Sequence, residues 1–121
     1  MAIRILIVDD DASFLGVAAE LLAERGFEVL DKAMDAAQAI AVAIRDRPDA
    51  ILLDINLPGR DGFATSAALS DACPSAMIVL TSADVRHIAA ELLRGCSADA
   101  FVPKEELVTT DLAGLFTRSG T

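Results

Sequence analysis

The sequence of 121 residues contains no tryptophan or tyrosine, few basic side chains and no long apolar stretch. Its two cysteines are too few for a disulfide scaffold and lack the spacing of metal ligands, so we expect free thiols. Ten lysines and arginines face nineteen acidic residues, and the net charge of −9 argues against direct binding of nucleic acid or of an anionic membrane. No apolar run approaches the ~18 residues of a membrane span. Arg4 and Asp9 interrupt the N-terminal apolar run, so we expect no signal peptide and a cytoplasmic location.

Hydrophobic residues make up 54% of the chain, which is enough for a buried core. No linker or repeat divides the sequence, and we expect a single domain over residues 1–121. Three nearly unbroken apolar runs are typical of strands buried on both faces of a parallel sheet, and two mixed runs are typical of strands nearer its edges. The five expected strands are Ile3–Val8, Phe27–Leu30, Ala50–Leu53, Ala76–Leu80 and Asp99–Val102.

Segments of helical periodicity separate these runs. The alternation predicts an α/β fold, a doubly wound five-stranded parallel sheet of the (βα)₅ type, in the flavodoxin-like order 2-1-3-4-5. A third helix is predicted over Asp61–Ala72, where alanine and serine blur the apolar face. The apolar faces of the other four helices are Phe14, Ala18, Leu21 and Leu22; Ala37, Ile40, Ala41 and Ile44; Val85, Ile88, Ala89 and Leu92; and Val108, Leu112, Leu115 and Phe116.

Polar side chains follow the carboxyl ends of four expected strands, where ligands bind in sheets of this kind. Each has a common structural role by itself, because acids after a strand often cap a helix and a lone lysine usually faces solvent. Neighbouring strands lie ~4.8 Å apart, so the predicted strand order brings these side chains together. They are Asp9, Asp10 and Asp11 after the first strand, Asp54 after the third, Thr81 after the fourth and Lys104 after the fifth.

Carboxylates crowded at this edge indicate a divalent cation. At ~5 Å each pair repels by about 3 kcal/mol at an effective dielectric of 20, and helix capping does not require such crowding. Ligands that are all oxygen favour Mg²⁺ or Mn²⁺ over zinc. A metal held by two acids, a nucleophilic carboxylate, a hydroxyl and an ammonium are the parts of phosphoryl transfer to an aspartate.

Four segments together resemble the receiver domains of bacterial two-component response regulators. The resemblance runs from Ile3 to about Phe116, and the segments that carry it are Ile5–Asp10, Leu52–Gly62, Val79–Ala83 and Ala100–Lys104. It implies that Asp54 accepts the phosphoryl group, that Thr81 hydrogen-bonds it and that Lys104 pairs with it. Phe101 matches an aromatic position that turns inward as Thr81 moves toward the phosphate, although it is equally consistent with a core residue.

The resemblance also implies the metal and the partners. Mg²⁺ would be bound by Asp9, Asp10 and Asp54, with the backbone carbonyl of Asn56 completing the protein's share of the shell. The phosphodonor would be a sensor histidine kinase or a histidine phosphotransfer protein. Phosphorylation would change the face formed by the fourth helix, fifth strand and fifth helix, which binds a downstream protein target or output domain. The chain would be a switch rather than an enzyme, catalysing only its own phosphoryl transfer and autodephosphorylation.

Three further features concern residues around the predicted site. Pro103 precedes Lys104, whereas many receivers have a proline after the lysine with a cis bond; here that bond is not expected. Asp11 extends the usual acidic pair and is predicted to cap the first helix. Phe14 either docks a phosphodonor or packs in the core. No output domain follows the fifth helix, so we expect a stand-alone receiver or one cut from a longer protein.

Two other functions fit part of the sequence. The run Asp9–Ser13 after an apolar strand resembles the signature of haloacid-dehalogenase-type phosphatases, in which Asp9 would be the nucleophile. That family's late acidic motif is missing, and Asp54 would have no role. A receiver fold that serves only as a non-phosphorylated interaction module usually lacks one of the key residues, and this chain has all of them.

Overall fold

The fold is a five-stranded parallel sheet between two layers of helix. It is seen in a computed structural model that describes residues 2–55, 57, 62–82 and 99–107. The strands are β1 (Arg4–Val8), β2 (Glu28–Val29), β3 (Ala50–Asp54), β4 (Met77–Ser82) and β5 (Ala100–Pro103), and their order is β2-β1-β3-β4-β5. The predicted α/β class and strand order are therefore confirmed.

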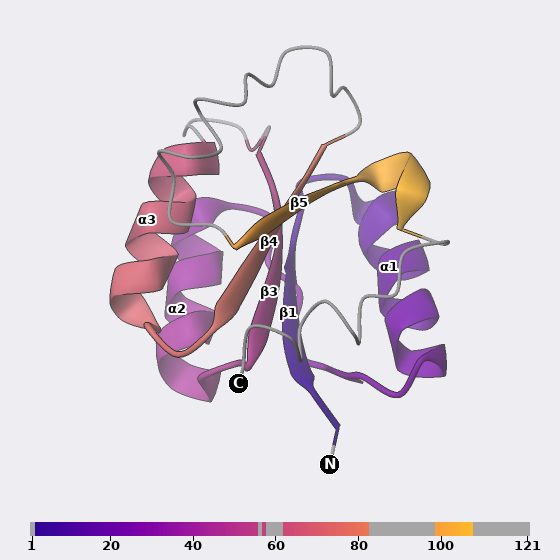
Figure 1. The fold of residues 1–121 in the computed structure, drawn as a ribbon, viewed down its shortest axis with the longest axis horizontal. Helices are drawn as coiled ribbons and strands as arrows, with labels where there is room; N and C mark the ends of the chain where they lie inside the picture. The colour runs from indigo at the N-terminus through magenta and orange to yellow at the C-terminus, as the bar shows by residue number, and fades with distance from the viewer. Residues whose placement is uncertain (1, 56, 58–61, 83–98, 108–121) are drawn as a thin grey trace.

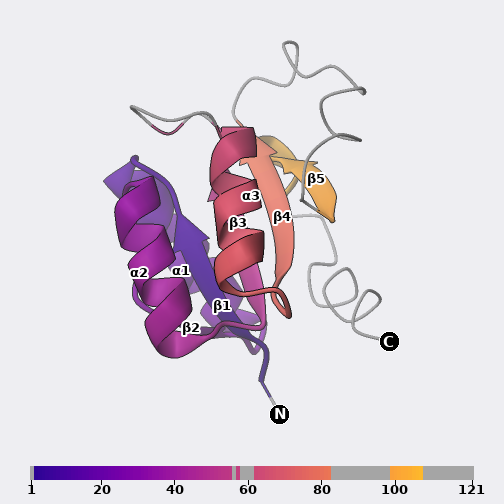
Figure 2. The same cartoon turned by 90° about the vertical axis from the view of Figure 1, so that its left-hand side faces the viewer.

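Helices cover both faces of the sheet (Figures 1 and 2). Helix α1 (Ala12–Glu24) lies on one face, and α2 (Ala36–Asp46) and α3 (Gly62–Ala72) lie on the other. A 3₁₀ helix, η2 (Lys104–Glu106), follows β5 directly. The predicted fourth and fifth helices fall in residues 83–98 and 108–121, outside the described residues.

The strands are buried because both of their faces meet apolar side chains. Along β1, Ile5 and Ile7 face the cluster around α1, whereas Leu6 and Val8 face the cluster under α2 and α3. All five residues of β3 and all six of β4 are buried. The sequence therefore shows unbroken apolar runs rather than alternation.

The predicted apolar face of α2 is only partly correct: Ile40 packs against the core cluster, whereas Ala37, Ala41 and Ile44 are exposed. Its buried side chains are Ala36, Ala39, Val42 and Ala43, and Ile44 is 55% exposed. Eight of the eleven residues of this helix are apolar, so more than one apolar stripe fits helical periodicity. The Asp35 side chain caps the helix by accepting from the backbone N–H of Gln38 at 2.8 Å, and the alanine face packs inward.

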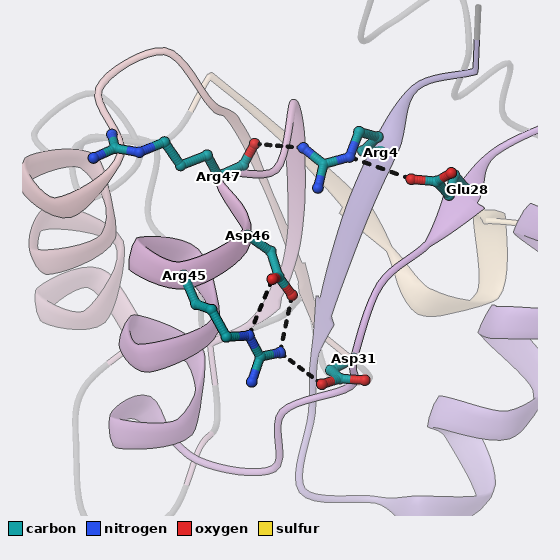
Figure 3. Close-up of polar contacts among 6 residues, drawn as sticks. All are labelled: Arg4, Glu28, Asp31, Arg45, Asp46 and Arg47. Atoms are coloured by element: carbon teal, nitrogen blue, oxygen red, sulfur yellow. Dashed lines mark hydrogen bonds and ion pairs between the residues drawn. The ribbon is translucent and has the colours of Figure 1, made fainter.

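Several ion pairs and hydrogen bonds lie on the surface away from the carboxyl ends of the strands (Figure 3). Arg4 donates to the backbone carbonyl of Arg47 at 3.0 Å, which ties β1 to the turn before β3. Arg45 pairs with Asp31 at 2.6 Å and with Asp46 at 2.9 Å. The Arg45 side chain is 58% exposed, so solvent screens both pairs and they contribute little to stability.

Over the part of the chain that the structure describes, no helix combines the length and apolar character required to cross a bilayer.

Candidate functional site

Parallel pairing places the predicted site residues at one edge of the sheet. The register pairs Val8 with Leu53, so Asp9 follows β1 beside the end of β3. It also pairs Asp54 with Thr81 directly. Ser82 pairs with Pro103, which puts Lys104 one residue beyond the end of β5. The carboxyl ends of β1, β3, β4 and β5 therefore carry the acids, the hydroxyl and the amine to the same place.

The acidic cluster consists of Asp9, Asp10 and Asp54. One carboxylate oxygen from each lies within 4.8 Å of the other two. Asp9 is fully buried and Asp54 is 3% exposed, whereas Asp10 is exposed to solvent. The cluster is thus open on one side and desolvated on the other.

Local hydrogen bonds orient the acidic run after β1. The backbone N–H of Asp9 donates to the carbonyl of Ala33 at 3.0 Å, and Asp9 Oδ1 accepts from the N–H of Asp11 at 2.9 Å. Asp11 Oδ1 in turn accepts from the N–H groups of Ser13 and Phe14. Asp11 is therefore the N-cap of α1, as predicted, and its carboxylate is not part of the cluster.

The Lys104 ammonium lies between two buried carboxylates. Its Nζ is 2.7 Å from Asp9 Oδ2 and 3.6 Å from Asp54 Oδ2, and its side chain is 17% exposed. Burial alone would lower the pKa of Lys104, but the close contact with Asp9 and the charges of Asp54 and Asp9 outweigh it, so the pKa is raised. The ammonium is held in its charged form.

Thr81 is buried with an unused hydroxyl. It is 0% exposed, and its Oγ1 makes no hydrogen bond within the described residues. Buried hydroxyls normally have a partner, because an unpaired one costs about 1–3 kcal/mol. This oxygen belongs to the strand position paired with Asp54, so its hydroxyl is available to donate to a polar group at that position.

The oxygen donors fit a hard divalent cation. Asp9 Oδ2 is buried and lies 2.7 Å from Lys104 Nζ, and an ionised carboxylate has enough lone pairs to bind a cation as well. Two further carboxylates lie within 4.8 Å. Mg²⁺ is commonly bound by one or two carboxylates and retains several waters, which the exposed side of Asp10 allows.

Three further site predictions concern Phe101, Asn56 and the peptide bonds near Lys104. Phe101 on β5 is half-buried and packs against the core cluster under α2 and α3. Asn56 lies outside the described residues. Every peptide bond among the described residues is trans.

Sequence reasoning missed one contact of the site. The ring of Phe14 lies under the Lys104 ammonium, 4.3 Å from Nζ to the ring centroid, and the side chain also packs against the core cluster around α1. Its place in the first turn after the acidic run was a signal that the ring lies near the cluster, but nothing in the sequence linked it to a lysine 90 positions away.

Comparison with known proteins gives consistent matches. A family model described as the response regulator receiver domain matches residues 5–112. The chain is 32% identical over 114 residues to a protein-glutamate methylesterase/protein-glutamine glutaminase of Archaeoglobus fulgidus, covering 93% of this chain and 32% of that protein. It is 31% identical over 101 residues to the transcriptional regulatory protein PdtaR of Mycobacterium tuberculosis, covering 84% and 49%. The chain thus spans a third to a half of the length of these relatives.

A solved structure shows a similar fold. A response regulator from Burkholderia pseudomallei superposes with a TM-score of 0.82 at 26% identity, covering 96% of this chain and 69% of that one. That crystal structure contains a phosphorylated aspartic acid, a calcium ion and citrate.

Proposed function

This chain belongs to the receiver-domain family of two-component response regulators, and on that premise we propose that Asp54 accepts a phosphoryl group in a Mg²⁺-dependent signalling switch. The observation that carries the proposal is the position of Asp54, which is buried between the Thr81 strand position and the Lys104 ammonium with Asp9 and Asp10 beside it. A nucleophile, a cation site and two donors for phosphoryl oxygens share one edge of the sheet.

In the proposed reaction an Asp54 carboxylate oxygen attacks the phosphorus atom of a phosphohistidine. The new P–O bond forms as the P–N bond breaks, and the imidazole nitrogen keeps the electron pair and takes up a proton. The Lys104 ammonium, already within 3.6 Å of Asp54, neutralises part of the charge that arrives. The donor would be a sensor histidine kinase or a histidine phosphotransfer protein.

Asp9, Asp10 and Asp54 would hold the Mg²⁺, and the backbone carbonyl of Asn56 is a further proposed ligand. The ion would supply positive charge to the phosphoryl oxygens and so relieve the repulsion between the acceptor and its donor. Lys104 and the hydrogen bonds that orient Asp9 keep the carboxylates in place before the ion arrives.

The switch would operate through Thr81 and Phe101. A phosphoryl group adds negative charge and acceptor oxygens next to the unused Thr81 hydroxyl, which gains a partner. Phe101 is half-buried on β5 beside Leu80, so movement of Thr81 would change the space available to it. The proposed result is a shift in population between two arrangements of the face formed by the fourth helix, β5 and the fifth helix.

The proposed function also implies a location and a set of partners for this chain. The chain would form one receiver domain over residues 1–121 in the cytoplasm, with no direct contact to nucleic acid or membrane. Its changed face would bind a downstream protein or an output domain. Its own chemistry would be limited to phosphoryl uptake and autodephosphorylation.

Mass spectrometry after incubation with Mg²⁺ and a small phosphodonor tests this function. The expected result is a single phosphate increment that Asp54→Asn abolishes. Asp71→Asn is the matched control, because Asp71 is an exposed acid on α3 away from the cluster. A phosphate increment that survives Asp54→Asn on another residue would overturn the assignment.

The phosphatase alternative is not favoured. The family match places the chain among receiver domains. The proposed nucleophile of that alternative, Asp9, is fully buried and ion-paired with Lys104. The interaction-only alternative is not favoured either, since the acids, Thr81 and Lys104 are together at one edge of the sheet.

A further inference from the structure

The Lys104 ammonium has an aromatic ring as its third neighbour. Besides the carboxylates of Asp9 and Asp54, its Nζ lies 4.3 Å above the centroid of the Phe14 ring. A cation over an aromatic face within about 6 Å is attracted by the ring quadrupole, and the attraction is larger when water is excluded. The Lys104 side chain is 17% exposed, so the contact is largely desolvated.

The backbone of Phe14 is held by the same chain of hydrogen bonds that orients the acids. Asp9 Oδ1 accepts from the N–H of Asp11, and Asp11 Oδ1 accepts from the N–H of Phe14 at 3.3 Å. Phe14 therefore lies in the first turn of α1, and its ring packs against the core cluster around that helix. Figure 1 shows η2, which begins with Lys104, beside the start of α1.

A lysine side chain needs such support to act at a fixed point. Its four-carbon stem is flexible, and holding it in one arrangement costs up to about 2 kcal/mol of rotamer freedom. The two carboxylates attract the ammonium from one side without limiting how the stem approaches them. The ring supplies a third contact for the ammonium, with Nζ 4.3 Å from its centroid.

From this geometry we propose that Phe14 is a positioning residue for phosphoryl transfer to Asp54. Its ring face holds the Lys104 ammonium within reach of both Asp9 and Asp54, so the charge that the reaction needs is in place before the phosphoryl group arrives. The inference rests on the proposed function of Asp54 and adds a residue from α1 to it. Phe14 acts through Lys104 and does not touch the reacting atoms.

Nuclear magnetic resonance can observe the contact directly, because Lys32 and Lys104 are the two lysines of the chain. In lysine-labelled protein without metal, the Cε protons of Lys104 are expected upfield of those of Lys32 through the ring current of Phe14. Phe14→Leu keeps an apolar side chain but should remove this shift, and Phe14→Tyr should keep it. Lys32 is exposed and serves as the internal reference in each variant. A Lys104 signal that is the same in Phe14→Leu and in the unchanged protein would overturn the contact.

Rates of phosphate uptake test whether Phe14 assists phosphoryl transfer to Asp54. Phe14→Leu should slow uptake about three- to tenfold, the range expected for a partly desolvated cation–π contact, and Phe14→Tyr should restore the rate. In a Lys104→Met background the Phe14→Leu substitution should have no further effect, because the ring acts through the ammonium. An equal slowing in both backgrounds would show that Phe14 acts through packing and would overturn the proposal, as would an unchanged rate.

This design separates the two proposals. If the unchanged protein takes up no phosphate while the Lys104 shift is present, the proposed function fails and the positioning role fails with it. If the unchanged protein is phosphorylated on Asp54 and Phe14→Leu is phosphorylated at the same rate, only the positioning role is overturned.

Discussion

Asp54 and Thr81 are paired positions on neighbouring parallel strands, and the pairing continues one residue further through a hydrogen bond from the N–H of Ile55 to the carbonyl of Thr81 at 3.1 Å. The backbone ladder therefore sets the spacing between these two strand positions in the unphosphorylated protein. Because Thr81 Oγ1 is buried without a hydrogen bond in the described residues, this arrangement keeps an unsatisfied polar group next to Asp54.

Thr81→Val is expected to stabilise the unphosphorylated protein. Valine has nearly the shape of threonine, so the change removes an unpaired buried hydroxyl and should raise the free energy of unfolding by about 1 kcal/mol. For a chain of this size that corresponds to an increase of about 3–5 °C in the unfolding midpoint. Thermal unfolding monitored by circular dichroism measures it, and the same variant should lose the part of any phosphorylation-dependent stabilisation that the Thr81 hydroxyl supplies.

Thr65→Val is the matched control for that experiment. Thr65 is also a fully buried threonine, on α3, but it has an interaction partner. Its replacement should destabilise the protein rather than stabilise it. Equal losses of stability in the two variants would contradict the view that the Thr81 hydroxyl is unsatisfied.

Lys104→Met is expected to destabilise the metal-free protein by about 3 kcal/mol. The substitution removes the ammonium 2.7 Å from the buried Asp9 carboxylate and one charge partner of Asp54, and removing one partner of a buried pair typically costs about 3–5 kcal/mol. Urea unfolding in the presence of a chelator measures the change. Lys32→Met should stay within about 0.5 kcal/mol, because Lys32 is exposed. Similar small effects of both substitutions would mean that the buried carboxylates need no ammonium.

The contribution of Lys104 to stability should depend on pH only in the alkaline range. Burial opposes the charged form, but contacts with Asp9 and Asp54 raise the pKa of Lys104 above its ordinary 10.5. A raised pKa means that the folded protein binds the proton more tightly, so the stabilisation is complete below 10.5 and is lost as the pH rises through the folded-state value. The difference in unfolding free energy between the unchanged protein and Lys104→Met should thus be constant from about pH 7 to 9 and shrink above about pH 10.5. A difference that already falls near neutral pH would contradict the raised pKa.

Mg²⁺ should stabilise the protein in a way that depends on Asp10. A ligand that binds the folded state at 100 times its Kd adds about 2.7 kcal/mol, and a tenfold loss of affinity in Asp10→Asn would remove about 1.4 kcal/mol of this. Thermal unfolding with and without Mg²⁺ measures both values. Asp11→Asn also removes one negative charge, at the neighbouring position, but asparagine still caps helices well. The stabilisation of this variant by Mg²⁺ should therefore match that of the unchanged protein. Equal losses of Mg²⁺ stabilisation in both variants would indicate that the ion responds to the overall negative charge and is not bound by Asp10.

The sequence was sufficient to predict the strands and the convergence of the acids. Runs such as Ala50–Leu53 are apolar on both faces because the sheet is covered on both faces, and short apolar runs between helical segments are typical of this arrangement. Parallel order places the carboxyl ends of β1, β3 and β4 at one edge, so Asp9, Asp54 and Thr81 lie close together there.

The sequence could not predict the rotation of α2 about its axis or the contacts of the Lys104 side chain. Eight of the eleven residues of α2 are apolar, so more than one stripe fits helical periodicity, and close packing against the sheet selects the one rich in alanine. Lys104 lies closer to Asp9 than to Asp54, and its ammonium lies over the Phe14 ring. Both contacts depend on the backbone of η2 and on the rotamer of a flexible side chain. Spacing along the chain carries no information about either.

The two outer strands of the sheet are both short. On one side β2 has two residues, and its Glu28 is exposed and ion-paired with Arg4 at 3.2 Å. On the other side β5 has four residues and ends in Pro103, which has no backbone N–H to offer. Long, flat outer strands act as templates on which other molecules add strands and form fibres, and brief strands with a charge or a proline resist this. The edges of the described sheet are therefore poor templates for aggregation, even though its central strands are among the most apolar and β-prone segments of the chain.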